Sequence, residues 1–188
     1  MAREQVKRKK AVEPAEIPRG ALLRDGKIVP NDSWIILNDI DGAPEGADVA
    51  VSITRFKAER DALLARNSGR LGVVIAAGEA VEEIAADAER FSLIFVQFPA
   101  FRDGRGFTTA RLLRERYGYK GELRASGDVL EDQVFYMLRC GFDAFELIAA
   151  DPEAAFARAS RTFTEAYQYT GDAFVPAHRK RARRKIPE

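Results

Sequence analysis

From Leu71 onward, short apolar runs alternate with segments of helical periodicity, and this alternation restricts the chain to few folds. Apolar runs of strand length occupy residues 71–75 and 93–96, and two further strands are expected at residues 122–125, which is more polar, and at residues 142–147. Helical segments occupy residues 79–91, 107–117, 129–140 and 151–167. Strands that alternate with helices predict an α/β protein with right-handed βαβ units and a mainly parallel sheet. The pattern fits an open doubly wound sheet and a partial β/α barrel equally well.

The part of the chain before Leu71 adds shorter elements. Asp25-Gly26 is a strong turn signal and predicts a β-hairpin between residues 22–23 and 27–29. A further strand is expected at residues 34–37, and these pieces would lie antiparallel at an edge of the sheet. A polar loop at residues 39–48 precedes a helix that Ser52 caps.

A single domain accounts for most of the 188 residues, and we expect it at residues 20–170, between basic tails at 1–19 and 171–188. Of 30 basic and 29 acidic residues, 11 basic and 2 acidic ones lie within residues 1–10 and 178–188, so the part between them has a net charge of −8. Basic tails can bind phosphates. The acidic body, and the lack of aromatic residues among the basic residues 178–185, argue against a nucleic-acid partner.

Cysteine and histidine are too scarce for most metal or nucleophilic chemistry. Cys140 is the single cysteine and His178 the single histidine, so the sequence predicts no disulfide and no metal site. A lone thiol suits the reducing cytoplasm, and we expect Cys140 to be a small buried residue. No apolar run approaches the roughly 20 residues that a membrane helix needs. We therefore expect a cytoplasmic protein without a membrane partner.

The loop after the second apolar run is the first candidate for a binding site, because ligands of parallel α/β proteins bind beyond the carboxyl ends of the strands. Asp103-Gly104-Arg105-Gly106 can bring bare backbone N–H groups and a guanidinium near an anion, and a following helix adds its positive end. The alternative is a structural loop that Asp103 caps. Neither a dinucleotide loop nor a Walker motif is present, so the sequence names no cofactor.

A charge inside the third expected strand is the second candidate. Arg124 needs a partner there, and Asp128 or Glu146 can supply one. Asp128 also fits the N-cap of the next helix, a position at which a carboxylate accepts a backbone N–H. On the preceding helix, Arg111 is expected to pair with Glu115.

These residues define one candidate site at the mouth of the sheet. The candidates for anion or substrate binding are Asp103, Gly104, Arg105, Gly106, Arg111, Arg124 and Gly127. The candidates for moving protons are Asp128 and Asp132.

Six short motifs carry a resemblance to a known family. They are Asp103–Gly106, Ala110–Arg114, Gly121–Arg124, Gly127–Val129, Asp132-Gln133, and Arg139 with Gly141–Asp143. In these motifs the chain resembles the bacterial domain-of-unknown-function family 934. Members of that family are commonly labelled as probable oxidoreductases involved in sulfite reduction. The resemblance thus implies a place in sulfate assimilation, and it supplies no catalytic residue.

Two functions follow as expectations. The first is an accessory protein of assimilatory sulfite reduction, which binds a small oxyanion or docks on sulfite reductase or its electron donor. The second is an enzyme that acts on a small anionic substrate, or on a bound cofactor, at the strand ends. The sequence does not decide whether the protein is an enzyme, and an iron–sulfur cluster within this chain is excluded because it has one cysteine.

Overall fold

The computed structural model describes residues 20–167, 170, 177, 179 and 180. Its core is one mixed sheet of eight strands in the order β2-β1-β8-β7-β6-β5-β4-β3. The strands are β1 (Ala21–Arg24), β2 (Lys27–Ile28), β3 (Ile35–Ile36), β4 (Val49–Ser52), β5 (Leu71–Ile75), β6 (Leu93–Phe98), β7 (Glu122–Val129) and β8 (Ala144–Leu147). The predicted tails at 1–19 and 171–188 lie outside the described residues, apart from 177, 179 and 180.

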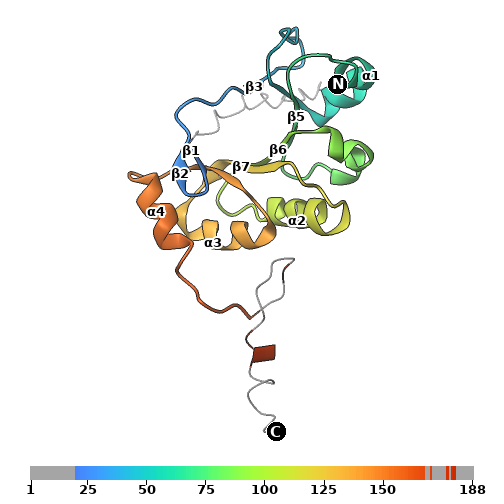
Figure 1. Cartoon of the computed structure of the whole chain (residues 1–188). Helices are drawn as coiled ribbons and strands as arrows, with labels where there is room; N and C mark the ends of the chain where they lie inside the picture. Colours follow the sequence, from blue (N-terminus) through green and yellow to red (C-terminus); the bar gives the residue numbers. More distant parts are fainter. Residues whose placement is uncertain (1–19, 168–169, 171–176, 178, 181–188) are drawn as a thin grey trace, which may run out of the picture.

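The order of the strands decides between the two architectures left open by the sequence. From β3 to β8 the strands are parallel and follow one another in chain order. A doubly wound sheet reverses this order at a switch point, and here it does not reverse. The sheet is therefore an open, curled α/β half-barrel (Figure 1).

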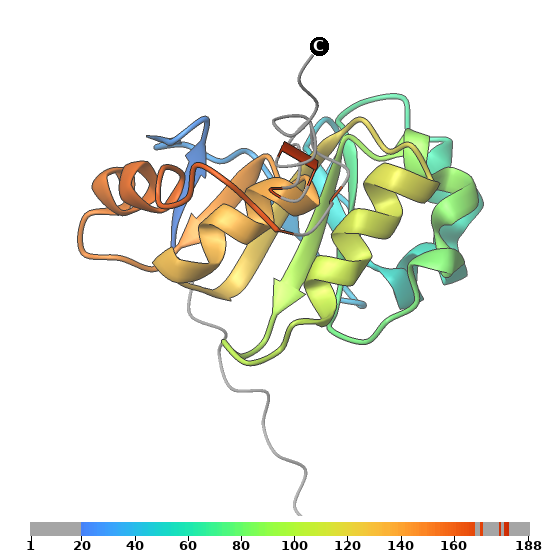
Figure 2. The same ribbon diagram turned by 90° about the horizontal axis from the view of Figure 1, so that it is seen from below.

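Successive right-handed crossovers put the helices on one face of the sheet. These helices are α1 (Ile53–Leu64), α2 (Arg105–Arg111), α3 (Glu131–Cys140) and α4 (Pro152–Ala159). Figure 2 looks onto this face, where α4, α3 and α2 lie side by side, from orange to yellow-green. Two short 3-10 turns, η1 (Val81–Glu83) and η2 (Ala85–Arg90), and a π-helical turn, η3 (Leu112–Arg116), complete it.

Three expectations about local structure were wrong. The segment 79–91 forms 3-10 turns instead of a helix, because Ala80 and Ile84 at its caps offer no side-chain acceptor. The last helix ends at Ala159, where the hydroxyl of Thr162 donates to the carbonyl of Arg158. Helix α3 starts after Leu130, so Asp128 is not its N-cap.

The N-terminal elements were predicted in part. The hairpin forms at Asp25-Gly26, whose φ angles of 49° and 75° match the favoured two-residue turn. It lies antiparallel against β8, whereas β3 lies parallel to β4 at the opposite edge, so the expected antiparallel pairing of the second piece was wrong. Strand β4 went unpredicted because its short apolar run follows a long polar loop.

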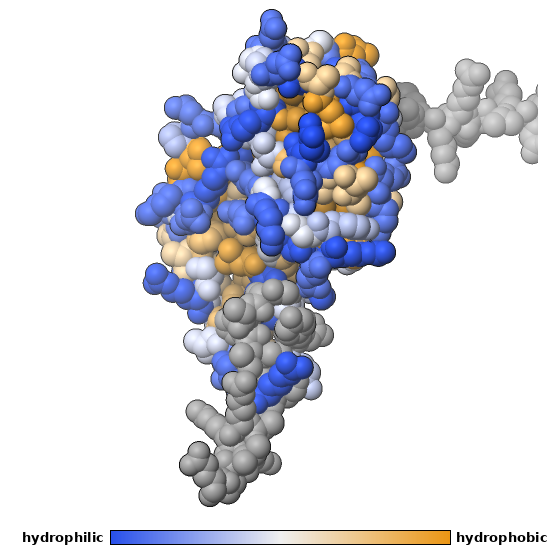
Figure 3. All heavy atoms as spheres, turned by 45° about the vertical axis from the view of Figure 1, so that its right-hand side comes forward, coloured by the Kyte–Doolittle hydropathy of each residue, from blue (hydrophilic) through white to orange (hydrophobic). Residues whose placement is uncertain are grey.

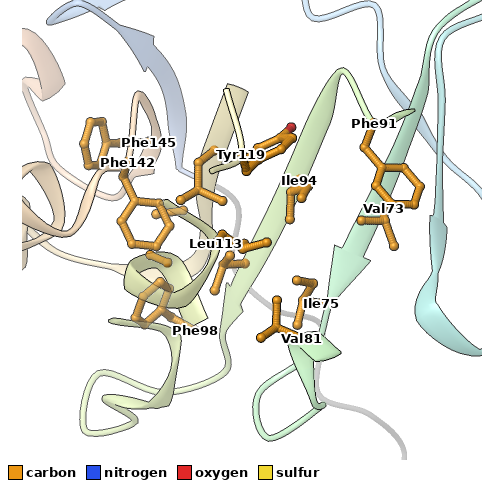
Figure 4. Packing of buried hydrophobic residues seen from close by; sticks show 14 of the residues in the cluster. Val73, Ile75, Val81, Phe91, Ile94, Phe98, Leu113, Tyr119, Phe142 and Phe145 are labelled. Carbon is orange, nitrogen blue, oxygen red and sulfur yellow. The ribbon is translucent and has the colours of Figure 1, made fainter. Parts of the chain in front are cut away.

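The main core lies between the sheet and its helices. Alternate residues of the strands, such as Val73, Ile94 and Phe145, meet residues of the helices and of the loops that follow them. Figure 4 shows Leu113 and the rings of Phe98, Phe142 and Phe145 gathered in this layer. The aromatic rings of Phe98 and Phe142 lie 5.9 Å apart.

The opposite face of the sheet has a cover of its own. Residues 29–34, here called the strap, join β2 at one edge to β3 at the other, and Figure 1 shows them passing on the side away from α2 and α3. Trp34 packs there against Ala50, Val74 and Phe95, which form a second, smaller cluster. Because the sheet is curled, its two edges are near enough for this short segment to connect them directly.

Two glycines, one in the loop before β4 and one in the turn before β5, test how tightly these connections are built. Gly46 and Gly69 have φ angles of 77° and 74°, but a side chain at Gly46 would meet nothing, whereas one at Gly69 would overlap the carbonyl of Ala47. We expect Gly46→Ala to lower the free energy of unfolding by about 1 kcal/mol. Gly69→Ala should lower it by about 3 kcal/mol, since the backbone must also move. Urea denaturation measures both, and equal losses would contradict the geometry.

Candidate functional site

The loop between β6 and α2, residues 99–104, lies at the carboxyl edge of the strands. Its centre is Phe101, whose backbone N–H donates to the Asp128 carboxylate at 2.7 Å. The backbone carbonyl of Phe101 accepts from Nε2 of Gln133 at 3.1 Å. Both sides of this peptide segment are thus held by side chains that follow the neighbouring strand, β7. The Phe101 side chain itself stays 43% exposed.

Arg105 is the first residue of α2 and its guanidinium is already engaged. It donates to both carboxylate oxygens of Asp103, at 2.9 and 2.5 Å, and its backbone N–H donates to the same carboxylate. The Arg105 side chain is 61% exposed and passes close to Gly78, in the loop after β5. The expectation that Asp103 caps this loop is confirmed. Asp103 therefore occupies the place where an external anion would bind.

These hydrogen bonds change the titration of Asp103. The Arg105 side chain, followed by the Arg105 backbone N–H, lowers the pKa of Asp103 to about 2. A lowered carboxyl pKa stabilises the folded loop at every pH above the ordinary value of about 4. That contribution is lost only as the pH falls through 2. The pair is intact at neutral pH.

The two glycines of the motif have different functions. A side chain at Gly106 would come within 3.0 Å of Phe98 and Val96, so this glycine lets α2 pack closely on β6. Gly104 is the N-cap of α2 and contributes no side-chain cap. The backbone carbonyl of Gly104 accepts from the N–H of Phe107 at 3.2 Å.

Arg111 lies at the other end of α2. Its guanidinium donates to both carboxylate oxygens of Glu115, at 3.1 and 3.3 Å, which confirms the expected pair. Together with Tyr136 it lines a separate groove between α2 and α3. Because six residues of helix rise by about 9 Å, Arg111 lies well away from Arg105.

Arg124 points to the other face of the sheet, beneath the strap. Its guanidinium is 0% exposed, lies 4.7 Å from the centre of the Phe95 ring and donates to Asp32 at 2.5 Å and to Glu122 at 2.8 Å. Glu146 approaches to 3.9 Å, so one of its two expected partners is confirmed and the other, Asp128, is wrong. Arg24 lies at the same cluster, 2.8 Å from Glu122 and 3.9 Å from Asp32.

Gly127 and Asp128 shape the end of β7. Gly127 has a φ of 98° and pairs with Phe98, where the register between β7 and β8 shifts. An irregularity of this kind re-aims the side chains that follow it, and Asp128 here turns toward the 99–104 loop. Asp132 is exposed in the first turn of α3 and lines a groove between α3 and α4.

The structure therefore divides the predicted site. Asp103, Gly104, Arg105, Gly106, Gly127 and Asp128 gather around the 99–104 loop. Arg124 lies on the opposite face, Arg111 at the far end of α2, and Asp132 in another groove, and among the described residues no hydrogen bond or ion pair joins these three to Arg105. The expectation that all of them share one mouth fails because side chains alternate between the faces of a strand. Anion binding at Arg105 stays a prediction.

Sequence reasoning missed several residues of this region. Gln133 accepts the N–H of Leu130 and holds Phe101, and its place three residues into α3 is a capping signal. Phe101 was visible as an aromatic residue in a loop of glycine, proline and arginine. Asp32 gave no signal, because only the crossing of the strap brings it to Arg124.

Other reactive groups in the described residues are shielded or scattered. Cys140 is 2% exposed, and burial raises the pKa of its thiol to about 11. Within the described residues, no group of three or more histidine, cysteine, aspartate or glutamate side chains is arranged to hold a metal ion. None of the helices in this part of the chain combines the length and the apolar character that crossing a bilayer requires.

The protein is an open α/β half-barrel. Its parallel strands follow one another in chain order, its helices lie on one face, and the 99–104 loop lies at the carboxyl edge, where ligands of β/α barrels bind. The chain belongs to the family described as bacterial protein of unknown function (DUF934), whose sequence model matches residues 72–178. This match confirms the family that the motifs predicted. A search of curated proteins finds no match to the sequence.

The cluster under the strap predicts a large effect of Arg124 on stability. Arg124→Met keeps most of the side-chain volume but removes the cation that Asp32, Glu122 and Glu146 share. We expect the free energy of unfolding to fall by about 3 kcal/mol. Arg111→Met, which breaks an exposed pair, should cost less than about 1 kcal/mol. Chemical denaturation of both variants checks this, and a cost for Arg124→Met no larger than for the control would refute it.

Because the Asp103 carboxylate already pairs with Arg105, we can predict how anion binding at Arg105 responds to substitution. Asp103→Ala frees the guanidinium and the Arg105 backbone N–H, so the affinity for sulfate or sulfite should rise by roughly tenfold. Isothermal titration calorimetry at low salt measures this affinity. Adding Arg105→Gln to the same variant should abolish the gain. If Asp103→Ala binds both anions no better than the parent protein, Arg105 is not an anion site.

Proposed function

We propose that the protein is an accessory protein of assimilatory sulfite reduction that acts by docking on sulfite reductase or its electron donor. The pathway comes from what the family resemblance implies. The docking role comes from the geometry of one residue. It is the exposed Phe101, held in place by Asp128 and Gln133.

An exposed aromatic side chain on a fixed backbone suits a protein contact. Phe101 makes no ring contact with another described residue and stays 43% exposed. Aromatic and arginine side chains supply a large share of the binding energy at interfaces, and Arg102 beside it is also exposed. Two long-range hydrogen bonds already fix the backbone, so less conformational entropy is lost when a partner binds.

The chemistry of the loop indicates the chemistry of its partner. Arg105 is neutralised by Asp103, which leaves Arg102 as the positive charge next to Phe101. A matching surface would offer an apolar recess for the ring and carboxylates at its rim. A small oxyanion could bind at Arg105 in addition, by replacing Asp103.

The alternative function, an enzyme acting on a small anion, has less support. It needs Asp128 and Asp132 near the arginines that hold the substrate. Asp128 instead accepts a hydrogen bond from the backbone of Phe101, and Asp132 lines the groove between α3 and α4. The two acids thus serve different places in the fold.

Capture from extracts of sulfate-grown cells tests the docking role. We expect the parent protein to retain sulfite reductase or its electron donor, and Phe101→Ala to retain it at least tenfold less, a loss of about 1.4 kcal/mol. Phe163→Ala is the matched control, because Phe163 is 57% exposed on a different part of the surface. Quantitative mass spectrometry of the retained proteins gives the ratio.

Two results would contradict the proposal, and they address its two parts. Equal capture by the Phe101→Ala variant and the parent would remove the loop from the interface. Normal growth of a gene deletion strain on sulfate as sole sulfur source would remove the protein from the pathway.

A further inference from the structure

The groove between α3 and α4 is the largest of the hollows described on this surface, with a volume of about 870 Å³. Its walls come from the start of α3, from residues 148–151 between β8 and α4, and from the end of α4 with the turn that follows it. Leu130 and Ile148 directly follow β7 and β8, so the groove lies at the carboxyl ends of these strands. Ligands of parallel α/β proteins bind at this edge, and small-molecule sites usually have volumes of about 300–1,000 Å³. The groove therefore has the place and the size of a small-molecule site.

The lining of this groove is mainly apolar. Its larger apolar side chains are those of Leu130, Phe135, Ile148 and Phe163. The rings of Phe135 and Phe163 meet edge to face with their centres 5.1 Å apart, and Phe163 stays 57% exposed. On the side of the molecule that Figure 3 displays, by contrast, the surface is mainly hydrophilic and its apolar patches are separate from one another. The exposed ring in the groove wall offers an apolar ligand a surface to cover.

The charged residues around the groove are mostly acidic. Glu131, Asp132, Asp151 and Arg158 line it, which gives three carboxylates and one guanidinium, a net charge of −2. Arg158 donates to both carboxylate oxygens of Glu131, at 2.9 and 2.8 Å. The Asp151 carboxylate accepts the backbone N–H of Ala154 at 3.0 Å. The single cation among the lining residues is thus already paired.

Asp132 is the carboxylate that a ligand can use. It is exposed, and it makes no hydrogen bond or ion pair with another residue of the described part of the chain. It precedes Phe135 by three positions, so the two side chains lie about one helical turn apart on the same side of α3. A negative charge therefore lies beside an aromatic ring in the groove wall. A molecule that matches both must carry a positive charge next to an apolar body.

We propose that this groove binds an organic amine, whose ammonium group pairs with Asp132 and whose apolar body lies against Leu130 and Phe163. The ammonium supplies the hydrogen-bond donors that the Asp132 carboxylate accepts. The apolar body leaves water as it covers the exposed ring of Phe163. Phe101 does not line this groove, so amine binding is independent of the docking proposed for the 99–104 loop.

Three probes that share a phenyl ring and differ in charge test the amine site: phenethylammonium, 2-phenylethanol and 3-phenylpropionate. Each is titrated into the isotope-labelled full-length protein, and the shifts of the backbone amide NMR signals give the place of binding and the dissociation constant. We expect phenethylammonium to shift the amides of residues 130–135 and 148–151. It should bind roughly two- to fivefold more tightly than 2-phenylethanol at low salt, as one exposed ion pair predicts, and 3-phenylpropionate should bind most weakly. At 1 M salt the ammonium and the alcohol should bind equally.

Two variants separate the charge from the apolar wall. Asp132→Asn should remove the preference for phenethylammonium and leave the affinity for 2-phenylethanol unchanged. Phe163→Ala should weaken the binding of all three probes by roughly threefold or more and keep the preference. Glu89→Gln is the matched control, because it neutralises an exposed carboxylate on η2, outside the groove, and should bind the probes like the parent.

Three results would overturn the proposal. An unchanged preference in Asp132→Asn would mean that Asp132 does not hold the ammonium. Failure of phenethylammonium to shift the amides around the groove would remove the site. Tighter binding of 3-phenylpropionate than of phenethylammonium would assign the groove to an anion at the start of α3.

Discussion

The ion pair between Arg124 and Asp32 is the interaction on which the architecture most depends. A half-barrel with all its helices on one side leaves the other face of its central strands uncovered. Here that face carries a fully buried guanidinium, and the carboxylate that holds it comes from the strap that crosses the sheet. The strap is thus fixed at two points, by the pairing of Asp32 with Arg124 and by the packing of Trp34. A buried charge is costly unless paired, so this pairing also specifies where the strap must lie.

At the carboxyl edge of the sheet, acids that could carry out chemistry serve instead to hold backbone in place. Asp103 neutralises Arg105, and Asp128 fixes the loop around Phe101. Both carboxylates thereby engage N–H donors that a bound ligand could otherwise have used. The edge also leaves the ring of Phe101 43% exposed, and this is the feature on which the proposed recognition of a protein surface rests.

The sequence predicted the repeated pattern better than the contacts between its parts. The alternation from Leu71 onward predicted β5 to β8, and Gly118 and Gly141 marked two helix ends through their positive φ angles. Strand β4 escaped because three apolar residues behind a polar loop resemble many loops. The separation of Arg124 from Arg105 was beyond reach, since it depends on which face of β7 points to the helices. Asp32 meets Arg124 across 92 positions, and no local signal foretells such a pair.

The two edges of the sheet have a consequence for how copies of this protein behave. The outermost strands, β2 and β3, are two residues long, and Pro30 follows the first of them. A strand of that length offers a neighbouring chain little backbone to pair with, and a proline close by withholds one more N–H. The half-barrel can therefore stay open at high concentration in the cell without growing, edge upon edge, into fibres.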